Sequence, residues 1–76
     1  MFSSKLFGQR LREARKSAGE TQTEVGELVG VKKSQISEME KGSTSTTVEK
    51  VVILCEHFQV SSDYLLGLTD DPAPRW

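Results

Sequence analysis

The sequence predicts an all-α fold, a compact single domain of five short helices. No segment alternates apolar and polar residues over a useful length, so strands are not expected. Apolar residues instead recur at helical spacing, and glycines and capping residues divide the chain into five segments. The chain has 76 residues, of which 36% are hydrophobic and 28% charged. This length and balance are typical of one ordinary globular domain.

The first three expected helices cover about residues 4–18, 22–29 and 33–41, and glycines follow each of them. The first carries an apolar stripe at spacings of four, three and four residues: Phe7, Leu11, Ala14 and Ala18. Thr21 and Glu24 have the spacing of a capping box at the start of the second. Gly26 lies inside the second helix, which suggests a close approach by another helix.

The start of the third helix is unusual. Lys32 is its expected N-cap, because Val31 and Ile36 then have the spacing of a hydrophobic staple. Lysine is a poor cap, and its charge has the wrong sign for a helix N-terminus. An approaching phosphate would favour a lysine at this position.

Two further helices are expected in the second half of the chain. Thr46 and Glu49 form a second possible capping box, and a broad apolar face follows: Val48, Val51, Val52, Leu54, Cys55 and Phe58. Ser61 is the expected cap of a short last helix that ends at Gly67. Two prolines and no apolar period predict a flexible tail over residues 69–76, which leaves residues 1–68 as the domain.

The segment from Thr21 to Gly42 pairs two helices across a short turn with glycine, as in a helix-turn-helix unit. The second helix of such a unit fits the major groove of DNA, where it needs polar side chains on its outward face. Lysine can donate to guanine, serine can bond either base type, and glutamate can accept from cytosine. The candidates for base contact are Lys33, Ser34, Ser37 and Glu38.

Phosphate contacts are expected at both ends of this unit, where backbone N–H groups and hydroxyl or cationic side chains are available. The candidates are Gln22, Lys32, Lys41, Ser43 and Thr44. The formal net charge of -1 argues mildly against a nucleic-acid partner. Its distribution argues for one, because residues 1–18 hold five basic side chains against Glu13 alone.

Several segments, in order and at matching spacing, resemble the phage-repressor and Cro-type (XRE) helix-turn-helix family over about residues 6–68. They are FGQRLREAR, the stretch from Thr21 to Gly42, and VEKVVILCEHFQVSSDYLLGL. The resemblance implies a lambda-repressor-like bundle that binds double-stranded DNA as a transcriptional regulator. Carried over by position, it places Lys33, Ser34 and Glu38 among base-reading residues, with Ser37 close by.

The same resemblance places Gln22 at a phosphate position and pairs Arg15 with Glu40 in a structural ion pair. This chain also departs from the family pattern. Glu20 replaces an apolar residue, Lys32 a small N-cap, and Gln59 a common glycine. Gln59 is therefore expected to adopt a left-handed backbone conformation. Glu38 is acidic where many relatives are neutral or basic, and these departures bear on affinity and target sequence more than on the fold.

One recognition helix contacts few base pairs, whereas two helices about 34 Å apart read a palindrome. We therefore expect a repressor that acts as a homodimer on a palindromic operator. The expected interface is the last helix and its flanks: Ile53, Tyr64, Leu65 and Leu68. The alternative is that such apolar groups, with Trp76, are ordinary scattered surface residues.

Other classes of function have less support. One cysteine and one histidine predict no disulfide, metal site or cofactor, and no small-molecule ligand is evident. No membrane span or signal peptide is predicted, so the expected location is the cytoplasm. A protein-interaction module that has lost DNA contact is one alternative, favoured by the net charge and Glu38. An enzyme fragment is another, opposed by the lack of any catalytic constellation.

Overall fold

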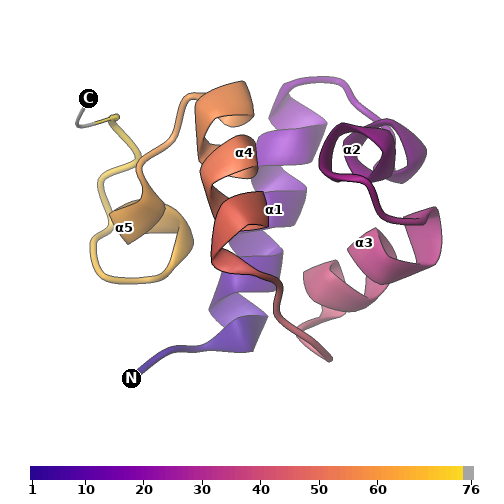
Figure 1. The fold of residues 1–76 in the computed structure, drawn as a ribbon. Coiled ribbons are helices and arrows are strands. Elements are labelled where there is room, and N and C mark those ends of the chain that lie inside the picture. The colour runs from indigo at the N-terminus through magenta and orange to yellow at the C-terminus, as the bar shows by residue number, and fades with distance from the viewer. Residues whose placement is uncertain (75–76) are drawn as a thin grey trace.

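The computed structural model describes residues 1–74, and within them the chain forms five helices and no strand. The helices are α1 (Ser4–Ser17), α2 (Gln22–Val29), α3 (Lys33–Lys41), α4 (Val48–Phe58) and α5 (Ser62–Leu65). In Figure 1, α2 and α3 lie to one side of α1 and α4, and α5 lies to the other. None of these helices is long and apolar enough to cross a membrane. The predicted all-α architecture is confirmed.

Local capping signals explain where the helices begin. The predicted box at α2 is present, since the Thr21 hydroxyl accepts from the Glu24 N–H and the Glu24 carboxylate accepts from the Thr21 N–H. Ser61 caps α5 as expected. At α4 the prediction was one residue early, because Thr47 rather than Thr46 is the cap. The Thr47 hydroxyl accepts from the Lys50 N–H at 3.3 Å.

The sequence predicted a left-handed backbone at Gln59 and a close approach at Gly26, and the structure describes both positions. Gln59 ends α4 with φ 56°, so the left-handed conformation expected of this non-glycine residue is confirmed. Gly26 is approached most closely by the turn after its own helix, and the first backbone nitrogen of α3, that of Lys33, would lie 3.5 Å from a Cβ atom there. A Cβ atom there would lie 2.6 Å from the Val31 carbonyl oxygen, and the Val31 N–H donates to the Gly26 carbonyl at 2.8 Å. Gly26 therefore lets the turn fold back onto α2.

The core is built around α1, and its buried apolar residues come from all five helices: Phe7, Leu11, Val25, Val29, Ile36, Met39, Leu54, Cys55 and Leu65. Gly8 brings the α1 and α3 backbones together, since a Cβ atom there would lie 2.7 Å from the Glu40 carbonyl oxygen. A side chain at this position would push α3 away from α1. The glycine at position 8 thus sets how closely α3 approaches α1.

The apolar residues of α4 are less deeply buried than predicted. Leu54 and Cys55 lie in the core, whereas Val48 is 77% exposed and Val52 48% exposed. The apolar set covers an arc wider than α4 can bury against α2 and α5. Ile53 lies half-buried against the core. Burial in the core raises the pKa of the Cys55 thiol.

The residues predicted for a dimer interface differ widely in how exposed they are. Leu65 is 1% exposed, because α5 turns it into the core, so its side chain is not at the surface where a dimer contact would form. Tyr64 is half-buried, and Leu68 is 73% exposed. Trp76 and Arg75 lie outside the described residues.

Residues 69–72, which we call the C-terminal strap, lie against the body of the domain. The sequence predicted a flexible tail from residue 69, and the structure shows contacts between these residues and the domain. Arg10 of α1 donates hydrogen bonds to the backbone carbonyls of Tyr64 and Thr69 and forms an ion pair with Asp70 at 2.9 Å. Its guanidinium also lies 4.1 Å from the centre of the Tyr64 ring. At the far end of the strap, the Pro72 carbonyl accepts from the Ser61 N–H.

Candidate nucleic-acid interface

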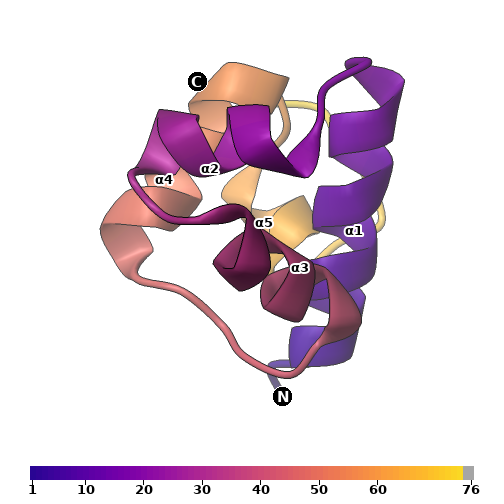
Figure 2. The same cartoon turned by 90° about the vertical axis from the view of Figure 1, so that its right-hand side faces the viewer.

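Helix α3 has one face in the core and the other in solvent. Ile36 and Met39 are buried, at 0% and 3% exposure. The predicted base-contacting residues lie on the remaining surface: Lys33, Ser34 and Glu38 are exposed, and Ser37 is half-buried. In Figure 2, α3 lies at the near side of the molecule, below α2 and beside α1. No other helix covers this side of α3 in that view.

The turn before α3 fixes its direction. Gly30 ends α2 in the left-handed conformation with φ 79°, which glycine adopts without steric cost. Lys32 then takes the extended N-cap conformation, with no side-chain hydrogen bond to the helix. Its charged group is therefore exposed at the start of α3, where the sequence placed a phosphate contact.

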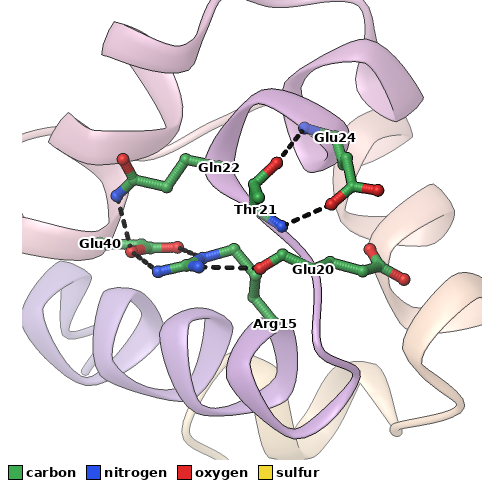
Figure 3. Close-up of polar contacts among 6 residues, drawn as sticks. All are labelled: Arg15, Glu20, Thr21, Gln22, Glu24 and Glu40. Carbon is green, nitrogen blue, oxygen red and sulfur yellow. Dashed lines mark hydrogen bonds and ion pairs between the residues drawn. The ribbon is translucent and has the colours of Figure 1, made fainter.

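A buried ion pair joins α1 to the end of α3 (Figure 3). The Arg15 Nε and Nη2 atoms lie 2.7 and 3.1 Å from the two carboxylate oxygens of Glu40. The side chains are only 11% and 4% exposed. The hydrogen bond to Glu40 raises the pKa of Arg15 above its usual value and outweighs the opposing effect of burial. This is the pair that the family resemblance implied.

The same pair is extended by two further hydrogen bonds. Arg15 Nη1 donates to the backbone carbonyl of Glu20 at 2.9 Å, and Gln22 Nε2 donates to Glu40 Oε1 at 3.0 Å. Three helices and the turn between α1 and α2 are thereby held in one arrangement. An amide has two N–H donors, so Gln22 keeps a second donor beside the one that bonds Glu40.

A polar cleft lies between α1, the start of α2 and α3. Four predicted DNA-contacting residues are among its lining: Gln22, Lys33, Ser37 and Lys41. The other predicted phosphate contacts lie elsewhere along α3. Lys32 lies at its beginning, while Ser43 and Thr44 are exposed after its end, where the Thr44 hydroxyl donates to the Ser45 carbonyl at 3.2 Å.

Sequence reasoning missed two charged members of this cleft. Arg12 of α1 lines it, and only the excess of basic residues near the N-terminus hinted at such a role. Glu20 also lines it, and its carboxylate lies 2.7 Å from His57 Nε2 of α4. That contact ties the turn between α1 and α2 to the last turn of α4. It also explains how an acidic residue is accommodated at a position that is usually apolar in the family.

Comparison with known proteins agrees with this geometry. A helix-turn-helix family model matches residues 11–65. The uncharacterised HTH-type transcriptional regulator YobD of Bacillus subtilis (strain 168) is 41% identical over 70 residues, which are 92% of this chain and 62% of that protein. Repressor protein C2 of Salmonella phage P22 is 36% identical over 64 residues, 84% of this chain and 30% of that protein.

A solved structure of the P22 c2 repressor in complex with a synthetic operator superposes with a TM-score of 0.75 at 38% identity. The superposition covers 80% of this chain and 92% of that one. This likeness confirms the predicted repressor-like fold. The chain spans less than two thirds of the two relatives' full lengths. The chain belongs to the phage-repressor and Cro-type (XRE) family of helix-turn-helix transcriptional regulators.

Proposed function

We propose that this protein binds a palindromic DNA operator as a homodimer and represses transcription by occupying that site. The observation that carries the proposal is the position of α3. Its polar face is exposed while Arg15 and Glu40 hold its far end rigidly against α1. A helix presented in this way can enter a major groove without rearranging the domain.

The side chains divide into two roles. Lys33, Ser34, Ser37 and Glu38 contact base edges, because they share the exposed surface of the first turns of α3. Phosphate contacts flank them on both sides: Gln22, Lys32, Lys41, Ser43 and Thr44. Glu38 repels phosphates and so lowers affinity for DNA in general, while favouring a base that donates to it, such as cytosine.

The dimer contact is proposed at the flank of α5, through Ile53, Tyr64 and Leu68. Leu68 is the most exposed of the three at 73%, so it is the residue to change. In sedimentation on operator DNA, Leu68→Glu should bind as a monomer at a half-site, since a buried charge at the dyad opposes pairing. Leu28→Glu, at another exposed leucine on α2, is the control and should leave the dimer intact. A wild-type monomer both free and on its site would reject dimerisation.

Selection from random duplex DNA, followed by titration of the enriched sequence across salt concentrations, tests the whole proposal. An enriched palindrome with affinity falling linearly in the logarithm of salt concentration is the expected result. Changing Ser34 and Glu38 to alanine should relax the sequence preference. Changing Lys41 to glutamine should weaken binding to all sequences alike.

A protein-interaction module is the second candidate, and the acidic Glu38 and the net charge of -1 favour it. The two candidates differ in their response to neutralising Lys33 and Lys41. A DNA-binding protein loses affinity and salt dependence, whereas an interaction module is indifferent. No enrichment in the selection, with weak binding that salt does not change, would direct the search to a partner protein.

A further inference from the structure

We infer that Arg12 of α1, outside the helix-turn-helix unit, is a further DNA-phosphate contact. It would hold the backbone from the α1 side of the cleft while α3 lies in the groove. The inference rests on the proposed function and adds a positioning residue to it. Three observations carry it: the cleft's charge balance, the rigid mounting of α1, and the lining that Arg12 shares with Gln22 and Lys33.

The charge balance of the cleft is opposite in sign to that of the whole chain. Its lining includes four cationic side chains and two carboxylates: Arg12, Arg15, Lys33, Lys41, Glu20 and Glu40. Glu40 is bound by Arg15 at 2.7 Å, and the Glu20 carboxylate lies 2.7 Å from the His57 ring, so the four cations and two carboxylates leave a net charge of +2 on the lining. Within residues 1–74, Arg12, Lys33 and Lys41 have no ion-pair partner. The unneutralised charge therefore favours an anion between α1 and α3.

Arg12 lies on a part of α1 that is held against α3, so a phosphate contact there would need little rearrangement of the backbone. Arg12 precedes Arg15 by three residues, so both side chains leave α1 on neighbouring positions of one face. The pairing of Arg15 with Glu40 and the close backbone approach at Gly8 hold this part of α1 against α3. Arg12 itself is exposed, and its planar guanidinium suits bidentate binding of a phosphate.

Arg12 shares the cleft with residues of the proposed interface, and they indicate which DNA phosphate it would contact. Gln22 and Lys33 line the same cleft, and Gln22 lies at the first position of α2. A DNA strand that passes Gln22 while α3 lies in the groove also passes the mouth of the cleft. Arg12 and Gln22 would then grip one stretch of backbone from two helices.

The test measures binding of Arg12→Gln to the selected duplex and to a random duplex across salt concentrations. Losing one phosphate contact should lower affinity by on the order of tenfold near 0.1 M salt and reduce the salt slope by about 0.9. The loss should be equal on both duplexes, because a phosphate contact carries no sequence information. Arg12→Lys should keep the wild-type slope. Lys16→Gln, an exposed position on α1 that does not line the cleft, is the matched control.

Three results would overturn the inference. The first is an unchanged salt slope for Arg12→Gln. The second is a loss confined to the selected duplex, which would make Arg12 a base contact. The third is an equal loss for Arg12→Lys, which would indicate a steric or structural role. If wild-type binding depends on salt and one of these is found, the proposed function stands without this contact. If wild-type binding shows no salt dependence, the proposed function fails and this inference fails with it.

Discussion

Helix α1 carries two largely buried arginines that contact different sides of the domain. Arg15 faces the helix-turn-helix side, where its partner Glu40 is only 4% exposed. Arg10 faces the C-terminal side, where its one carboxylate partner, Asp70, is fully exposed and its other acceptors are the backbone carbonyls of Tyr64 and Thr69. The two arginines are chemically identical, but the carboxylate partner of Arg15 is buried, whereas that of Arg10 is exposed.

This difference predicts different costs of removal. At Arg15, a buried carboxylate would be left without its counter-charge, and the loss would be large. Removing Arg10 would leave two backbone carbonyls and the exposed Asp70 carboxylate without this donor. No buried charge would lose its counter-charge, so the loss of stability would be smaller. The helix-turn-helix side therefore depends on a matched pair, and the C-terminal side on one donor with several acceptors.

The largest effect is expected from Arg15→Met. It should lower the free energy of unfolding by about 3–5 kcal/mol, because Glu40 stays buried without its partner. The double variant Arg15→Met with Glu40→Leu should recover much of this loss, since no charge is then buried. Urea denaturation of the two single variants and the double variant measures the coupling. Additive losses would show that Arg15 and Glu40 are not coupled, which would contradict the difference described between the two arginines.

A smaller effect is expected from Arg10→Met, about 2 kcal/mol, because hydrogen bonds from a charged donor to two carbonyls are lost. The C-terminal strap should also detach. Amide hydrogen exchange at Ser61, whose N–H donates to Pro72, should then accelerate, while exchange within α2 and α3 should not change. Equal acceleration on both sides of α1 would contradict the separation of the two regions.

Asp70→Asn isolates the exposed half of the Arg10 cluster. Because Asp70 is fully exposed, we expect a change of no more than about 0.5 kcal/mol, and one that disappears in high salt. Thermal unfolding with and without added salt measures it. A loss as large as that of Arg10→Met would mean that the ion pair, and not the carbonyl contacts, holds the strap.

The smallest effect concerns pH and lies on the helix-turn-helix side. Hydrogen bonds from the Thr21 backbone N–H and hydroxyl lower the pKa of Glu24. A lowered folded-state pKa stabilises the fold at pH values above the unfolded pKa of about 4.3, and this contribution is lost as pH falls through the folded value. NMR titration of the Glu24 carboxyl should show the lowered midpoint. Thr21→Val should move it back toward the usual value, whereas Thr23→Val should leave it unchanged.

The sequence predicted the helix-turn-helix side better than the C-terminal side, for a physical reason. Its signals are local: Thr21 and Glu24 cap α2, while Gly30 and Gly42 end α2 and α3. Such signals act between residues a few positions apart, so they can be read from the chain directly. The Arg15–Glu40 pair is not local, and it was expected only because the family resemblance implied it.

The Arg10 contacts could not be predicted in this way. Two of its acceptors are backbone carbonyls, which any residue provides, and Asp70 lies 60 residues later in the chain. The prolines near Asp70 looked like a flexible tail, although Pro72 supplies a carbonyl acceptor to Ser61. The place of Arg12 in the cleft depends on how three helices pack, so a count of basic residues could only hint at it.

The long reach of Arg10 also has a consequence for the order of folding. Glu40 follows Arg15 by 25 residues, whereas the acceptors of Arg10 follow it by 54 to 60. The larger loop has the greater closure entropy, so we expect the Arg10 contacts to form after the rate-limiting step. Chevron kinetics of Arg10→Met would then show faster unfolding and almost unchanged refolding. On the ribosome, the pair that mounts α3 can close while the strap is still being synthesised.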